Sequence, residues 1–131
     1  MARRLTLIED DLIFGQRVRS AARRLGVSLD VVSRSDAPTR RWQSGDVVVL
    51  QATLRPGQQV ALVEALLQRE PSPQVIAVTG HMETELRRRL KVLGATLAAH
   101  SAMDRVLARA LGISADAAGA DHARDDPSVQ Q

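Results

Sequence analysis

The segment Asp46-Val47-Val48-Val49-Leu50 decides the fold of this chain. Its four apolar residues are continuous and mostly β-branched, which is the pattern of a strand that is buried on both faces. Because strands of this kind occur in parallel sheets with helices on both sides, we expect 47–50 to be a central strand of an α/β domain. The segment 74–79 has the same character and predicts a second buried strand.

Further strands and helices alternate on both sides of this centre. Short apolar segments predict three more strands, over 5–8, 27–32 and 95–99. Apolar residues that recur every three or four positions predict helices over 14–25, 57–69, 82–93 and 103–111. The segment 35–45 is too short for more than about two helical turns, and we expect Trp42 to pack it against the domain.

This alternation specifies the fold class. Five strands joined through helices by short connections predict a doubly wound α/β domain, in which helices cover both faces of one parallel sheet. We assign residues 1–113 to this domain. The segment 114–131 is expected to be a disordered C-terminal tail, since Ala, Asp, Gly, Ser and Gln dominate it. In such a domain, functional residues are expected at the carboxyl ends of the strands.

The composition excludes several classes of function. The 131 residues contain no cysteine, so disulfides, thiolate catalysis and cysteine-bound metal sites are excluded. The apolar stretches are far shorter than the roughly 20 residues that cross a bilayer, and Glu9 falls where a secretory signal would have its apolar core. We therefore expect a cytoplasmic protein without a membrane partner. A net charge of +3 and a near absence of aromatic residues argue against a nucleic-acid partner.

Three consecutive carboxylates, Glu9, Asp10 and Asp11, follow the first expected strand. Carboxylate oxygens are ligands for Mg²⁺, a hard cation that keeps several of its waters. Acidic groups at the start of the next helix also cap free backbone amides and interact favourably with the helix dipole. Both interpretations, a metal site and helix capping, are compatible with the sequence.

Four motifs occur in order along the chain: Leu7-Ile8-Glu9-Asp10-Asp11, Asp46-Val47-Val48-Val49-Leu50, Val75-Ile76-Ala77-Val78-Thr79-Gly80 and Lys91-Val92-Leu93-Gly94-Ala95. Together they resemble the successive landmarks of the response-regulator receiver domain, over residues 4–112. The resemblance implies a five-stranded parallel sheet of flavodoxin-like topology, with strand order 2-1-3-4-5. It also implies phosphoryl transfer from a histidine kinase to an aspartate that ends the third strand, with Mg²⁺ held by the acidic residues after the first.

The resemblance assigns roles to individual residues of this pocket. Glu9 and Asp10 match the metal-binding acidic pair. Thr79 matches the hydroxyl residue that ends the fourth strand and responds to the phosphoryl group. The lysine that pairs with the phosphoryl group in the family falls at His100 or Ser101, and neither residue supplies a permanent cation.

The phosphoacceptor position departs from the family pattern, because it is Gln51 in this chain. An amide is a poor nucleophile and offers no carboxylate oxygen to attack phosphorus, so we expect no phosphorylation there. Binding of Mg²⁺ at Glu9 and Asp10 is expected to be weak at most, since one carboxylate of the family's usual ligand set is lost.

The favoured interpretation is a stand-alone pseudo-receiver, which acts in signalling through protein–protein contacts and is not an enzyme. In the receiver family, contacts with partners form on the fourth helix, fifth strand and fifth helix, and a homodimer through this face is expected here. The corresponding residues have mixed charges that suit pairing with a second copy: Arg87, Arg88, Lys91, Asp104, Arg105 and Arg109.

Three other interpretations remain open. A regulator phosphorylated at an unconventional site would use Glu9, Asp10 or Asp11 as the acceptor. A nucleic-acid-binding regulator is suggested by Arg3, Arg4 and the arginine-rich helices, and its affinity would fall steeply with added salt. A small enzyme on the same scaffold would need a convergent polar pocket, and the sequence contains no complete catalytic set.

Overall fold

The computed structural model describes residues 3–113, and the tail expected over 114–131 lies outside the described residues. Five strands form one sheet: β1 (Leu5–Glu9), β2 (Leu29–Ser33), β3 (Val47–Gln51), β4 (Gln74–Thr79) and β5 (Thr96–Ala99). Their spatial order is β2-β1-β3-β4-β5, and every pair of neighbours is parallel. The expected doubly wound α/β fold and its strand order are confirmed.

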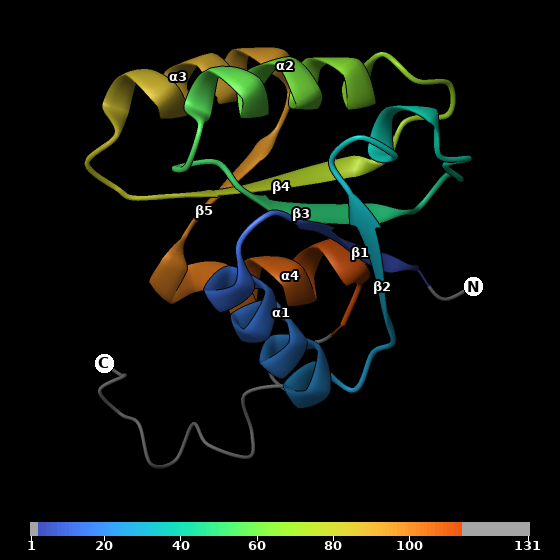
Figure 1. Cartoon of the computed structure of the whole chain (residues 1–131). Coiled ribbons are helices and arrows are strands. Elements are labelled where there is room, and N and C mark those ends of the chain that lie inside the picture. Colours follow the sequence, from blue (N-terminus) through green and yellow to red (C-terminus); the bar gives the residue numbers. More distant parts are fainter. Residues whose placement is uncertain (1–2, 114–131) are drawn as a thin grey trace.

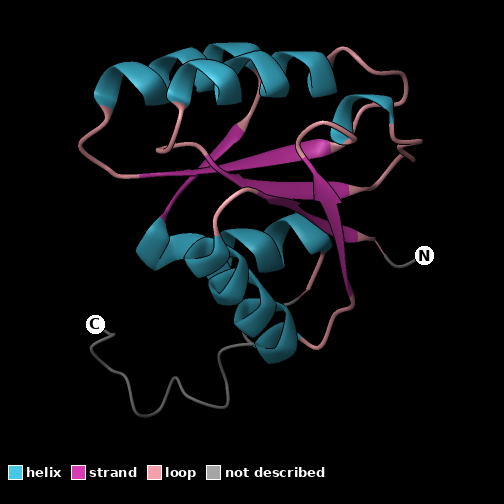
Figure 2. Ribbon diagram, viewed as in Figure 1, coloured by secondary structure: helices cyan, strands magenta, loops and turns pink. Residues whose placement is uncertain are grey.

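Helices cover both faces of the sheet, as Figures 1 and 2 show. One face carries α1 (Leu12–Leu25) and α4 (Met103–Leu111), and the other carries α2 (Pro56–Leu67) and α3 (Thr84–Leu93). Two short 3₁₀ helices, η1 (Ala37–Thr39) and η2 (His100–Ala102), complete the chain. The elements begin and end within two residues of their expected positions. Within residues 3–113 there is no helix of the length and apolarity that crossing a membrane requires.

The continuous apolar run in β3 is explained by the two cores that it joins. Val47 and Val49 pack in the core beneath α1 and α4, whereas Val48 and Leu50 pack in the core beneath α2 and α3. All four side chains are fully buried. Because successive side chains of a strand point to opposite faces, only a strand that is covered on both sides needs every position apolar.

Asp11 caps the first helix. Its Oδ1 accepts a 3.1 Å hydrogen bond from the backbone N–H of Ile13, which would otherwise lack an intrahelical partner. Gly26 ends the same helix with a positive φ of 71°, a conformation that glycine adopts without steric cost. Helix capping is therefore confirmed for Asp11, the third carboxylate of the acidic run. Glu9 ends β1, and Asp10 follows it.

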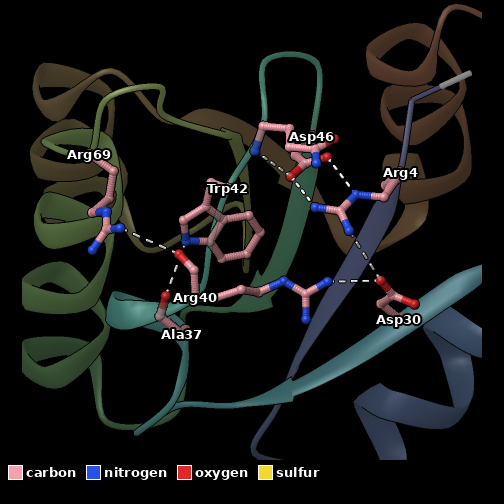
Figure 3. A network of polar contacts seen from close by, with 8 residues as sticks. Arg4, Asp30, Ala37, Arg40, Trp42, Asp46 and Arg69 are labelled. Atoms are coloured by element: carbon pink, nitrogen blue, oxygen red, sulfur yellow. Dashed lines mark hydrogen bonds and ion pairs between the residues drawn. The ribbon is translucent and has the colours of Figure 1, made fainter. Parts of the chain in front are cut away.

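The connection between β2 and β3 contains only η1 where the other crossovers contain a full helix. Figure 3 shows how this segment is held. Trp42 is buried, and its Nε1 donates a 3.1 Å hydrogen bond to the carbonyl oxygen of Ala37. The guanidinium of Arg40 lies 5.3 Å from the centre of the indole ring, and Arg69 donates to the carbonyl oxygen of Pro38. The prediction that Trp42 packs down a shortened segment is confirmed.

A buried carboxylate anchors the N-terminal end of β3 (Figure 3). Asp46 is 2% exposed and accepts two hydrogen bonds from Arg4, at 2.9 and 2.6 Å, and one from the backbone N–H of Gln43. Burial favours the protonated form of Asp46, but these hydrogen bonds outweigh it and lower the pKa of the carboxyl. Asp30 of β2 joins the network through Arg4, at 3.9 Å, and also pairs with Arg40 at 2.8 Å. These contacts hold together the amino ends of β1, β2 and β3.

Candidate functional site

The residues expected in the pocket lie together at the carboxyl ends of the strands, because the strands are parallel. Glu9 is the last residue of β1, Gln51 of β3 and Thr79 of β4, and His100 follows β5 directly. In the register of the sheet, Gln51 pairs with Val78, next to Thr79. The carboxyl ends of neighbouring strands in a doubly wound sheet are the usual position of a functional site.

Asp10 is enclosed by partners from two other elements. Its Oδ2 lies 3.0 Å from the Nη2 of Arg34, which follows β2, and accepts a 3.0 Å hydrogen bond from the Nε2 of Gln59 in α2. The Asp10 side chain is only 10% exposed, and Gln59 is fully buried. Arg34 also donates to the side-chain oxygen of Gln58. The carboxylate therefore has a counter-charge and a neutral donor from its own chain.

Glu9 is turned towards α1. Its Oε1 lies 3.2 Å from the Nη2 of Arg19, and both side chains are about one-third exposed. Gly15 makes room for this pair, since a Cβ atom at that position would lie 3.0 Å from Nη1 of Arg19 and 3.5 Å from Oε2 of Glu9. A pair this exposed contributes little to stability, but it holds the Glu9 side chain beside α1.

Gln51 is tied to the same buried amide as Asp10. The Nε2 of Gln59 donates a 2.7 Å hydrogen bond to the backbone carbonyl of Gln51, in addition to its bond to Asp10. The side-chain oxygens of Gln51 and Gln59 are both buried and have no hydrogen-bond partner among the described residues. The structure therefore brings together Asp10, Gln51 and Gln59 around two unpartnered amide oxygens.

Thr79 and the loop that follows it are also held by side chains. The Nη1 of Arg87 donates a 2.6 Å hydrogen bond to the Oγ1 of Thr79, which is fully buried. Glu83 accepts hydrogen bonds from Thr53 at 2.8 Å and from the backbone N–H of Gly80 at 2.9 Å. These contacts connect the loop after β3 to the loop after β4.

His100 packs against α1. Its ring meets the ring of Phe14 edge-on, with the centroids 6.4 Å apart, and its Nδ1 is buried without a hydrogen-bond partner among the described residues. Burial lowers the pKa of His100, and the positive charge of Arg17 lowers it further, although the negative charge of Glu83 opposes them. His100 therefore favours the neutral form at physiological pH, so it supplies no permanent cation at the strand end where the resemblance expects a lysine.

The arrangement does not fit a bound Mg²⁺. Asp10 faces Arg34 and Glu9 faces Arg19, so each carboxylate already has a positive partner. Gln51 offers an amide oxygen where the resemblance expects a third carboxylate. Among residues 3–113, no three acidic or histidine side chains are grouped closely enough to hold a metal ion. Weak binding at Glu9 and Asp10 remains a prediction, and it would require at least one arginine to move.

Three residues of the predicted interaction face are engaged within the chain. Arg88 pairs with Glu85 one helical turn away, at 2.6 Å. Asp104 accepts two hydrogen bonds from Arg24 of α1, at 2.6 and 3.0 Å. The third is Arg87, whose guanidinium points to Thr79 as described above.

The other three residues of that face are Lys91 of α3 and Arg105 and Arg109 of α4. All three are exposed, and none makes an ion pair within the part of the chain that the structure describes. Between the two helices, β5 forms one edge of the sheet. The face is thus a sheet edge flanked by unpaired positive charges.

The residues that surround Asp10 and Glu9 were not predicted from the sequence. Nothing in the segment around Arg34 indicates that its side chain reaches Asp10, because that contact depends on the absence of a helix after β2. The signal for Gln59 was present: it is a polar residue beside the apolar stripe of α2, at a position that is fully buried. Gly15, inside a predicted helix, was a signal of close approach to the Glu9–Arg19 pair.

Comparisons with known proteins identify solved structures that share this fold. The chain matches no protein-family model and no curated protein. It is similar to the crystal structure of a response regulator receiver protein from Burkholderia phymatum, with 20% identity, a TM-score of 0.63 and coverage of 87% of this chain and 98% of that one. A response regulator from Colwellia psychrerythraea is 11% identical, with a TM-score of 0.65. The match covers 86% of this chain and 98% of that one.

A third solved structure, the isolated REC domain of RcsB from Salmonella enterica serovar Typhimurium, is 14% identical. Its TM-score is 0.64, and 86% of each chain is covered. At such low identities these likenesses concern the backbone and carry no residue roles to this chain. The chain has the fold of response-regulator receiver domains.

Proposed function

We propose that this chain is a stand-alone pseudo-receiver, a regulatory module that acts through protein contacts and receives no phosphoryl group. The observation that carries the proposal is Gln51. It ends β3 at the edge of the sheet where Glu9 and Thr79 also end their strands, which is the position of the phosphoacceptor in the receiver family. An amide in this place cannot form the acyl phosphate on which that signalling depends.

The surrounding charges support the same conclusion. Phosphoryl transfer needs cations around the developing negative charge, supplied by Mg²⁺ and by a basic side chain. Here His100 is neutral, because burial and Arg17 lower its pKa. Arg34 and Arg19 are cations, but they already neutralise Asp10 and Glu9. Both carboxylates of the pocket are therefore balanced by arginines of the same chain, and the guanidinium of Arg87 is bonded to Thr79.

Thr79 offers a further argument. A hydroxyl that responds to a phosphoryl group has to be free to change partners. In this chain the Oγ1 of Thr79 is buried and accepts a charge-assisted hydrogen bond from Arg87 at 2.6 Å. The residue is therefore fixed in one arrangement, which is what a module in a single constitutive state requires.

Incubation with a small-molecule phosphodonor and Mg²⁺, followed by intact mass spectrometry, tests the absence of phosphorylation. We expect no added phosphoryl group on the natural chain. The Q51D variant restores a carboxylate at the end of β3 and serves as the matched comparison. A stable phosphorylated species of the natural chain, mapped to Glu9, Asp10 or Asp11, would establish the unconventional acceptor instead.

The protein contact is proposed to form on the face of α3, β5 and α4. Val92 of α3 is 77% exposed there and gives the face an apolar contact point beside the unpaired charge of Lys91. In an isologous dimer, Glu85 and Asp104 of one copy would exchange their arginines for basic residues of the other. Such an exchange keeps every carboxylate paired, while Arg88 and Arg24 give up their partners within the chain.

Sedimentation over a range of protein concentrations tests this face. The double variant K91E/R105E is expected to weaken self-association of the natural chain. R41E changes an exposed arginine in the connection between β2 and β3 and should leave self-association unchanged. If the natural chain is monomeric at all concentrations, the proposed dimer is wrong, and a partner with an acidic surface becomes the occupant to test.

A further inference from the structure

A groove lies between α1 and the start of α4, two helices that pack on the same face of the sheet (Figure 1). Its volume of about 410 Å³ is within the range of small-molecule sites. The polar side chains that line it come from one side of α1 and from the segment after β5: Gln16, Arg17, Ser20, Arg24, His100 and Asp104. Of the residues expected in the pocket at the strand ends, only His100 lines this groove, so the two are separate features of the surface.

Arg17 gives the groove a positive charge that no carboxylate balances. Its side chain is exposed and makes no ion pair with any residue of 3–113. Arg24 and Asp104, the other two charged residues of the lining, are joined by two hydrogen bonds of 2.6 and 3.0 Å. Since these two charges cancel, the guanidinium of Arg17 is left to attract an anion.

Two further features of the groove suit an oxyanion. Ser20, one turn after Arg17, accepts a 3.2 Å hydrogen bond from Arg23, so its own hydroxyl hydrogen can be donated to a ligand. Ala102, the residue before α4, has no side chain that could cap the helix, and the amides of the first turn give this end of α4 a partial positive charge. A guanidinium, a hydroxyl and a helix end are groups that hold phosphate and carboxylate oxygens in proteins.

The lining also includes an apolar part. Ile13, one turn before Arg17, lines the groove although 74% of it is exposed, and Met103 of α4 lines it as well. A bare inorganic ion would leave the Ile13 side chain in water. An anion that carries a carbon body would cover it, and the burial of apolar surface would add to the affinity.

We propose that this groove binds a small organic anion, whose phosphate or carboxylate group is held by Arg17 and Ser20 and whose carbon body covers Ile13. The inference goes beyond the proposed function, since it gives the module a small-molecule ligand. It holds whether or not the chain receives a phosphoryl group, because the groove contains neither Gln51 nor the carboxylates of the strand ends.

His100 provides a second readout of binding. Its Nδ1 is buried without a hydrogen-bond partner among residues 3–113. Burial and the positive charge of Arg17 lower the pKa of His100, while the negative charge of Glu83 raises it, and the paired Arg24 and Asp104 border the same groove. An anion bound to Arg17 cancels the repulsion between Arg17 and a protonated His100. The pKa of His100 should therefore rise when the groove is occupied.

Backbone-amide NMR titrations with phenyl phosphate and with benzoate, at constant ionic strength and without Mg²⁺, test the proposal. We expect saturable shifts centred on Gln16, Arg17 and Ser20, and a raised pKa of His100 at saturation. R17Q should weaken binding about tenfold or more, because a charge-assisted hydrogen bond is lost. The control R41Q changes an exposed arginine between β2 and β3 and should leave the midpoint unchanged. The probe that binds more tightly identifies the head group.

Three results would overturn the proposal. The first is the absence of saturable shifts with both probes, and the second is an equal midpoint for R17Q and the natural chain. The third is a set of shifts centred on Gln51 and Thr79, which would place the anion in the pocket at the strand ends. No phosphodonor is present, so the outcome is independent of the test of phosphorylation.

Discussion

The guanidinium of Arg87 in α3 is bonded to the hydroxyl of Thr79 at the end of β4, with 2.6 Å between Nη1 and Oγ1. Thr79 is fully buried, so this contact fixes a side chain that has no access to solvent. It also connects the helix of the proposed interaction face to the edge of the sheet where the pocket lies. A partner that binds α3 would therefore act on Thr79 through a single side chain.

Replacing Arg87 by alanine is expected to free this edge of the sheet. The R87A variant should lose about 1–2 kcal/mol of stability, because a charge-assisted hydrogen bond is lost and the Thr79 hydroxyl is left unpaired. Hydrogen exchange at Thr79 and Gly80 should speed up. Denaturant unfolding and amide exchange measure the two effects, with R89A, an exposed position on the same helix, as the control. Equal effects of R87A and R89A would show that the contact is unimportant.

The network around Asp46 predicts a pH dependence of stability. Because the folded-state pKa of Asp46 is lowered, its contribution is fully present above the unfolded value of about 3.9 and is lost as the pH falls through the folded value. D46N should cost about 1–3 kcal/mol at pH 7, a range that allows for the partial exposure of Arg4. At a pH below the folded pKa, the difference between D46N and the natural chain should shrink.

Urea unfolding at a series of pH values measures this dependence. The D36N variant is the matched control, because Asp36 is exposed and its side chain makes no hydrogen bond or ion pair within residues 3–113. A stability difference for D46N that is the same at every pH would show that the charge of Asp46 is not what stabilises the fold.

The lowered pKa of His100 predicts a second dependence of stability on pH. Its folded-state pKa lies below the ordinary value because of burial and Arg17, so the unfolded chain binds the proton more readily. Stability should therefore rise with pH as it passes from the folded pKa of His100 to the unfolded value of about 6.5. The R17Q variant removes one cause and should raise the pKa of His100. Histidine NMR titration measures it, and an unchanged pKa in R17Q would contradict this assignment.

Trp42 is expected to hold the shortened crossover. W42F keeps most of the buried ring but leaves the carbonyl oxygen of Ala37 without its donor, which should cost about 1–2 kcal/mol. W42A also leaves a cavity and should cost about 3–5 kcal/mol. Thermal unfolding followed by circular dichroism measures both variants. If W42F were as stable as the natural chain, the indole hydrogen bond would have no part in holding η1.

The sequence was sufficient for the fold because the decisive patterns are local. The strand over 74–79 and the helix over 103–111 have the expected bounds, since a continuous apolar run and a helical stripe each identify themselves. Gln51 could also be placed at the end of β3, because it follows the buried run directly. These features depend only on periodicity and order along the chain.

The partners in the pocket could not be predicted in the same way. Arg34 meets Asp10 across 24 residues, and Arg87 was expected on the interaction face although its guanidinium turns to Thr79. Long arginine side chains have many rotamers, and their choice depends on which carboxylates and hydroxyls the fold brings near. With seventeen arginines in the chain, the sequence offers too many possible pairs to choose among.

The central claim is that the pocket at the carboxyl ends of the strands receives no phosphoryl group. The measurement that tests it most directly is a backbone-amide NMR titration of the natural chain with Mg²⁺, and then with Mg²⁺ and beryllofluoride, a mimic of the phosphorylated aspartate. We expect no shift that depends on beryllofluoride at Gln51, Thr79 or His100. Shifts at these residues that require beryllofluoride would contradict the account, because they would show that the pocket still recognises a phosphoryl group.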